Sequence, residues 1–145
     1  MQVWLRYALL ASVTAAGTAH WVGPTDSTPA YFTAAPARST GAILTGTQLS
    51  GPNFSHSFQV TAYEMAARIE RVLYQQPCYC RCDRALRHKS LHSCFEGTHG
   101  AECGTCMRQA MYAYQQTKLG KSPQEIRAGI QRGEAEGLRL EDASL

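Results

Sequence analysis

Six cysteines lie within residues 78–106, and their spacing is suited to chemistry that needs several thiols close together. Cys78, Cys80 and Cys82 alternate with other residues. Neighbouring cysteines in a Cys-x-Cys pair seldom bond to each other, because the short loop would strain the disulfide. The three thiols must therefore find partners elsewhere in the chain or converge on a soft cation. The other three cysteines are Cys94, Cys103 and Cys106.

The first hypothesis is a site for a soft metal ion, Cu(I) or Zn(II), built on the Cys-x-Cys-x-Cys loop. His88 and His92 are four residues apart, so on a helix both imidazoles would lie on one face. The alternative for each histidine is to pack beside the apolar face with its nitrogens hydrogen-bonded. The predicted metal ligands are Cys78, Cys80, Cys82, His88, His92, Cys94, Cys103 and Cys106.

Two other hypotheses use the same thiols. In the run Cys103-Gly104-Thr105-Cys106 the second cysteine begins a predicted helix, where unpaired N–H groups stabilise a thiolate. This predicts a thiol–disulfide oxidoreductase that uses Cys103 and Cys106 on a redox partner protein, although the βαβ context typical of such enzymes is missing. Alternatively, three structural disulfides join the loop of residues 78–82 to the remaining cysteines and staple an interaction domain. No Ser–His–acid pattern indicates a hydrolase.

The residues around the cysteines also resemble a known family. The segments that carry the resemblance are 75–83 (QQPCYCRCD), 88–91 (HKSL), 94–95 (CF), 103–107 (CGTCM) and 120–123 (GKSP). Together they cover about residues 57–132 and resemble the bacterial PCYCGC-motif family, also called the CYCXC (seleno)protein family. Arg81 stands where the family name has Gly. The resemblance implies an exported thiol protein, and its selenoprotein relatives hint at redox chemistry at one of the thiols.

The hydrophobic pattern predicts an all-α domain of four helices over residues 57–132. The first helix should begin at the capping box of residues 61–64 and end before Pro77. The others are expected over about residues 83–95, 105–119 and 123–132. No segment alternates apolar and polar side chains as a strand does, so no sheet is expected. The hydrophobic core of such a short domain gives only marginal stability, so we expect the Cys/His cluster to staple the fold together.

The flanking segments are predicted to lie outside this domain. Residues 1–19 have the charged start, short apolar core and small-residue boundary at Ala19 of a signal peptide, so the mature protein is expected in the periplasm or secreted. The apolar run is too short for a stable membrane span. Residues 20–56 predict a flexible linker and residues 133–145 a charged tail. The balance of 14 basic and 11 acidic residues does not call for nucleic acid, and a monomer is expected.

Overall fold

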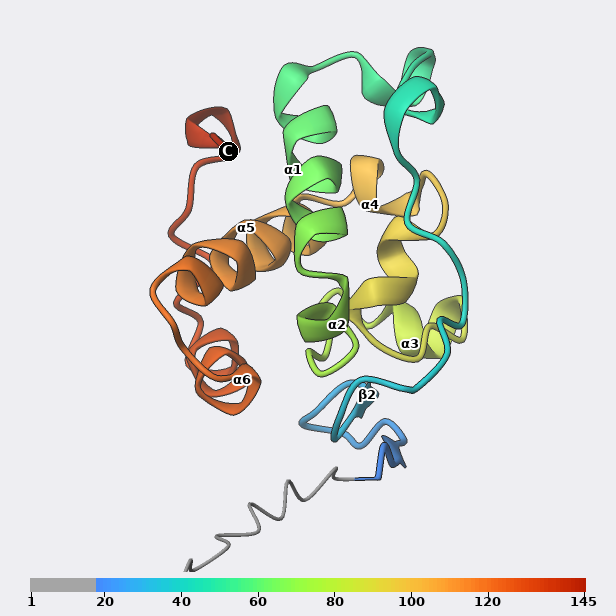
Figure 1. The fold of residues 1–145 in the computed structure, drawn as a ribbon, viewed down its shortest axis with the longest axis vertical. Helices are drawn as coiled ribbons and strands as arrows, with labels where there is room; N and C mark the ends of the chain where they lie inside the picture. Colours follow the sequence, from blue (N-terminus) through green and yellow to red (C-terminus); the bar gives the residue numbers. More distant parts are fainter. Residues whose placement is uncertain (1–17) are drawn as a thin grey trace, which may run out of the picture.

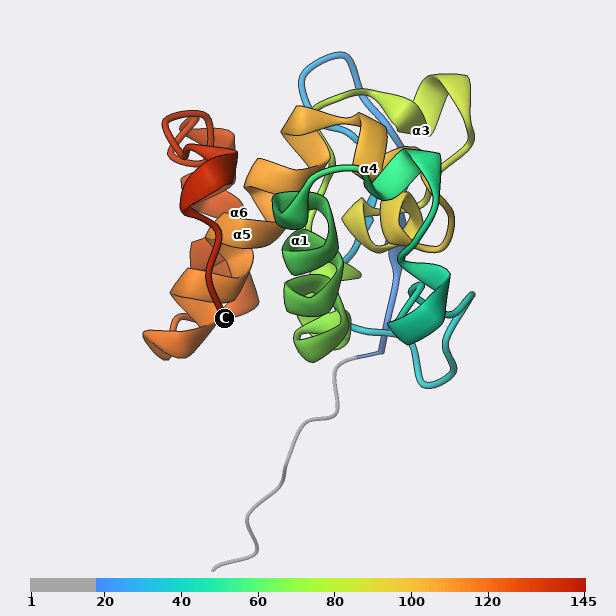
Figure 2. The same cartoon turned by 90° about the horizontal axis from the view of Figure 1, so that it is seen from above.

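The helices α1 (Ser57–Arg68) and α5 (Gly104–Lys118) cross and pack against each other, and they carry much of the core (Figure 1). The structure is a computed structural model that describes residues 18–145. From above, α1 stands between α5 and α6 on one side and α3 and α4 on the other (Figure 2). The remaining helical elements are α2 (Glu70–Leu73), α3 (Cys82–Ala85), α4 (His99–Glu102), α6 (Pro123–Gln131) and the 3-10 turns η1 (Gly46–Gln48), η2 (Pro52–Phe54), η3 (Leu91–Phe95) and η4 (Leu140–Asp142).

The all-α class is confirmed, and the last two predicted helices lie where the sequence places them. The N–H of Glu125 donates to the Ser122 hydroxyl, and the Ser122 N–H donates to the Glu125 carboxylate, so the predicted capping box starts α6. Gly120 has φ 78°, a left-handed conformation that glycine adopts without strain, and it ends α5. Within residues 18–145 no helix is both long and apolar enough to cross a membrane.

The first helix begins earlier than predicted. The Gln59 side chain accepts the N–H of His56 at 2.8 Å, so His56 caps α1 five residues before the predicted cap, Thr61. Thr61, which was expected to cap the helix, donates its hydroxyl to the Ser57 carbonyl inside α1. A break at Ile69, with φ −123° and ψ 27°, then separates α1 from the short α2.

The second predicted helix, residues 83–95, is wrong. The chain forms only α3, and Arg87 then turns into the left-handed region with φ 58°, so the helical hydrogen-bond ladder stops. The chain resumes as the 3-10 turn η3. Consequently His88 lies in a loop and His92 in η3, and the two imidazoles do not share a helix face.

Residues 20–56 pack on the helical body, which corrects the expectation of a mobile linker. Ile43, Leu49 and Phe54 are buried in the hydrophobic core, where the Phe54 ring packs edge-on against Tyr63 of α1. The backbone is bound as well: the N–H of Leu44 donates to the Phe95 carbonyl at 3.0 Å. In Figure 1 this segment runs along one side of the helices.

A short antiparallel ribbon also corrects the expectation that no sheet would form. Strands β1 (Trp21–Val22) and β2 (Tyr31–Phe32) pair, and the N–H of Phe32 donates to the Tyr74 carbonyl at 2.9 Å. The ribbon is too short for the alternation that reveals a strand in sequence.

The two ends of the chain differ in what the structure describes. The predicted charged tail packs on α1 and α5, since Leu140 is buried and the Arg108 side chain donates to the Leu138 carbonyl at 2.9 Å. The predicted signal peptide, except for Thr18 and Ala19, lies outside the described residues.

Candidate metal centre

The cysteine triplet forms a tight turn between α2 and α3. Pro77 ends the preceding segment, and the N–H of Arg81 donates to the Cys78 carbonyl at 3.1 Å, which closes the turn. Arg81 itself lies in the left-handed region, with φ 62° and ψ 26°. The turn buries the side chains of Cys78 and Cys82 and leaves Cys80 half-buried.

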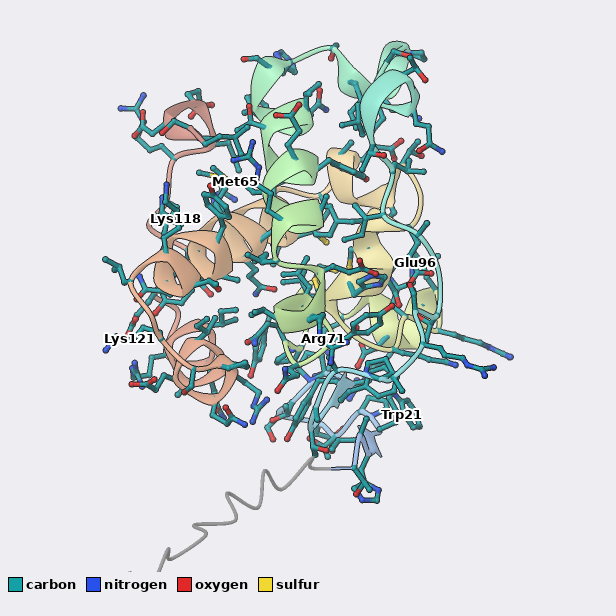
Figure 3. All side chains as sticks on the ribbon, in the orientation of Figure 1. Trp21, Met65, Arg71, Glu96, Lys118 and Lys121 are labelled. Atoms are coloured by element: carbon teal, nitrogen blue, oxygen red, sulfur yellow. The ribbon has the colours of Figure 1, made fainter. Side chains whose placement is uncertain are left out.

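The other three cysteines come to this turn from two further segments. Cys94 is buried in η3, Cys103 is the N-terminal cap of α5, and Cys106 is buried in the first turn of that helix. The closest Sγ–Sγ distances are 3.3 Å for Cys78–Cys80, 3.4 Å for Cys78–Cys106, 3.6 Å for Cys80–Cys106 and 3.3 Å for Cys82–Cys94. Figure 3 shows sulfur atoms in the interior of the molecule.

These distances distinguish bonded disulfides from unbonded thiols that lie close together. A disulfide needs an S–S length of about 2.05 Å, and all six cysteines are free thiols. Two sulfurs bound to one tetrahedral ion at about 2.3 Å each would lie about 3.8 Å apart. The observed separations of 3.3–3.6 Å are much closer to this second value.

Two histidines complete the cluster. The Nδ1 atom of His88 lies 3.4 Å from the Cys94 sulfur. His99, the first residue of α4, packs edge-on against the His88 ring with the centroids 5.3 Å apart. Its Nε2 atom is buried and has no hydrogen-bond partner among the described residues. Buried polar atoms are nearly always paired, so this nitrogen is suited to accept a metal ion.

His92 does not belong to the cluster, which corrects the prediction that it is a ligand. Its ring is fully buried and stacks on Tyr74, with centroids 3.9 Å apart. Its Nδ1 lies 2.8 Å from the Glu96 carboxylate and its Nε2 lies 3.2 Å from that of Glu70. With both nitrogens in contact with carboxylates, His92 has none free for a metal. Glu96 also accepts from Thr40 on the segment of residues 20–56, so this contact fastens that segment to η3 (Figure 3).

The ligand atoms form three groups in which every atom lies within 4.8 Å of the others. They are here called the loop group (Cys78, Cys80, Cys82, Cys94), the helix group (Cys80, His99, Cys103, Cys106) and the histidine group (Cys82, His88, Cys94, His99). Four sulfur or nitrogen ligands are the usual set of a structural zinc site. The cluster is therefore able, by its geometry, to hold a metal ion.

The thiols control one another's ionisation. Hydrogen bonds, chiefly from Cys103, hold the pKa of Cys80 well below its usual range. Hydrogen bonding with Cys106 lowers the pKa of Cys82 to about 2. The pKa of Cys106 is raised, chiefly by its hydrogen bond with Cys103. The thiolate of Cys82 raises the pKa of His88 in spite of the ring's burial. The cluster thus concentrates negative charge on Cys80 and Cys82.

Solvent reaches the cluster from the histidine side. His88 lines a surface pocket of about 410 Å³ together with Arg87, Lys89 and Glu96. His99 and Cys103 are also half-buried, whereas Cys94 and Cys106 are fully enclosed. An ion can therefore approach past His88, which a metal site needs as its entry path.

A family model described as a protein of unknown function with PCYCGC motif matches residues 52–139. This stretch covers more than half of the chain and contains every ligand of the three groups. The chain belongs to the PCYCGC family. No curated protein and no solved structure matches it. The PCYCGC match is wider than the predicted 57–132, because it includes η2 before α1 and residues beyond α6.

The one visible departure from the PCYCGC motif has a structural cost. The motif has glycine where this chain has Arg81, and Arg81 adopts a left-handed φ of 62° that glycine adopts freely. The arginine side chain offsets part of this strain, because its guanidinium donates to the Thr25 carbonyl at 2.6 Å. The motif glycine is thus explained by the backbone of the turn.

We expect Arg81→Gly to be more stable than Arg81→Ala by about 1 kcal/mol in urea unfolding. Both variants lose the same contacts of the Arg81 side chain. The difference between their free energies of unfolding therefore reports the cost of the left-handed backbone conformation. Equal stabilities would contradict the strain assigned to this turn.

Most of the predicted ligands meet in the cluster. The structure brings together Cys78, Cys80, Cys82, His88, Cys94, Cys103 and Cys106 and leaves out His92. The missed residue is His99. It precedes Cys103 by four positions and Cys106 by seven, but Cys103 is extended, with φ −117° and ψ 103°, and separates α4 from α5, so the three residues do not share one helix face.

Proposed function

We propose that this protein binds a soft metal ion, Cu(I) or Zn(II), through its Cys/His cluster, and that it does so outside the cytoplasm. The observation that carries the proposal is the convergence of six unbonded thiols and two imidazoles from five segments of the chain. Thiolates select soft cations, and imidazole suits both copper and zinc. The fold holds these ligands together although its hydrophobic core is small.

The location rests on the signal-peptide pattern of residues 1–19. In an oxidising compartment, thiols only 3.3–3.6 Å apart are at risk of forming disulfides. A bound ion would protect them, because a coordinated thiolate is less available as a nucleophile. The proposed location and the proposed ligand therefore support each other.

Thiol–disulfide exchange is the second candidate, and one observation favours it. The N–H of Cys106 donates to the Cys103 sulfur at 3.4 Å at the start of α5, a contact that lowers the pKa of Cys103, although the hydrogen bond with Cys80 and burial leave that pKa raised overall. Reversible oxidation of this pair would make the protein a redox partner of another thiol protein.

An anaerobic titration of the reduced protein with Zn(II), in competition with a chromophoric chelator, tests the proposal. We expect stoichiometric binding and release of protons as the thiols become ligands. His92→Ala is the matched control for His99→Ala: only the His99 variant should bind more weakly. A reduced protein that binds neither Zn(II) nor Cu(I), but cycles between dithiol and disulfide, would establish the second candidate instead.

A further inference from the structure

The three ligand groups overlap, so no two of them can each hold an ion through four ligands of its own. The loop group and the helix group share Cys80, and the loop group and the histidine group share Cys82 and Cys94. The helix group and the histidine group share only His99. A thiolate sulfur has enough lone pairs to bind two ions, whereas one imidazole nitrogen has a single lone pair.

Among these pairs, only the loop and helix groups together use all six thiols. The two groups adjoin directly: Cys78 of the loop group lies 3.4 Å from Cys106 of the helix group, sulfur to sulfur. Cys80 lies between them, 3.3 Å from Cys78 and 3.6 Å from Cys106. The shared ligand is therefore a thiolate in contact with sulfurs of both groups.

We propose that the centre binds two soft metal ions bridged by the thiolate of Cys80. This inference rests on the proposed function and specifies its stoichiometry. The first ion takes Cys78, Cys82 and Cys94 as its other ligands, and the second takes Cys103, Cys106 and His99. Each ion is then four-coordinate, and each ligating thiol releases its proton to the solvent.

Two features of the helix group support the second ion. The buried Nε2 of His99 has no hydrogen-bond partner among residues 18–145, and coordination would satisfy it. With only the loop group filled, Cys106 would be left without a metal although its sulfur lies 3.4 Å from that of Cys78. A second ion would bind the Cys106 sulfur and displace its proton.

Native mass spectrometry of the anaerobically reduced full chain with excess Zn(II) tests this inference. Two ions per chain are expected. One ion per chain would overturn the two-ion centre while leaving the proposed function intact. No bound ion with Zn(II), and none with Cu(I) in a parallel sample, would overturn the proposed function itself.

Three serine variants test the bridge. Cys78→Ser should damage only the first ion's site and Cys103→Ser only the second's, so each should retain one tightly bound ion. Cys80→Ser should weaken both ions by more than about 100-fold, since loss of an outer-shell partner alone costs about 10–100-fold. If Cys80→Ser keeps one ion at wild-type affinity, the bridge is wrong.

A measurement on the wild-type chain guards against a variant that does not fold. X-ray absorption at the zinc edge of the two-ion form should contain a metal–metal contribution, because one shared sulfur holds the ions close together. Two bound ions without that contribution would mean separate sites and would overturn the bridged centre.

Discussion

Loading the reduced protein with Zn(II) should raise its midpoint of thermal unfolding by about 10 °C. A ligand present at about 1,000 times its Kd stabilises the native state by about 4 kcal/mol, and each kcal/mol shifts the midpoint by about 2–4 °C in a chain near this size. The unfolded chain should bind zinc much more weakly than the folded protein, because only folding brings the ligands together from the loop of residues 78–82, from η3, from α4 and from α5. Differential scanning calorimetry with and without zinc measures the shift.

Two variants make this measurement specific to the cluster. His92→Ala should lower the midpoint of the metal-free protein, because the buried ring bridges two carboxylates, but its zinc-dependent shift should match that of the wild type. Cys94→Ala should lose a large part of the shift, since Cys94 belongs to two of the three ligand groups and is a ligand of the first ion. A shift that is as large in Cys94→Ala as in the wild type would place zinc elsewhere.

Tyr63→Ala should cost about 3–5 kcal/mol of unfolding free energy, the usual cost of removing a large buried aromatic side chain. Tyr63 is completely buried and meets the rings of Phe54 and Phe95 edge-on at 5.1 and 4.9 Å. Its hydroxyl donates to the Gly97 carbonyl at 2.6 Å and accepts the Ala101 N–H at 3.1 Å. Burial raises its pKa, so the hydroxyl stays neutral and can donate.

Tyr63→Phe separates the hydroxyl from the ring. It should cost about 1–3 kcal/mol, because it leaves the buried N–H of Ala101 without its partner. The two contacts flank His99, so the variant should also weaken zinc binding without removing a ligand. Tyr114→Phe is the matched control: its hydroxyl meets Arg68 only at 3.5 Å, and its loss should cost less than about 0.5 kcal/mol. Urea unfolding of the three proteins compares them, and equal costs for the two Phe variants would contradict the role of Tyr63.

The parts of the fold that depend on interactions between residues close in the sequence could be predicted from the sequence. The capping box at Ser122, the stop at Gly120 and the apolar face of α5 all act within a few residues, and the structure confirms them. The gathering of the cysteines could also be expected, because a Cys-x-Cys-x-Cys loop cannot satisfy its own thiols. These features depend on sequence separation alone.

Two of the failures have the opposite cause, since they depend on contacts between distant segments. His92 has the spacing of a ligand, but Glu70 and Glu96 occupy both of its nitrogens. The i, i+4 argument for His88 failed because Arg87 breaks the helix with a left-handed φ of 58°. Residues 20–56 have the composition of a linker, yet Ile43 and Phe54 fit the core one by one. Composition or periodicity averaged over a segment of sequence does not reveal such contacts of single side chains.

X-ray absorption at the metal edge of the loaded wild-type protein tests the central claim most directly, because it reports the atoms around the ion. We predict a first shell dominated by sulfur at about 2.3 Å, with a minor nitrogen contribution from histidine. A first shell of only nitrogen and oxygen atoms, with all six cysteines still free to react with a thiol reagent, would contradict a metal centre built on this cluster.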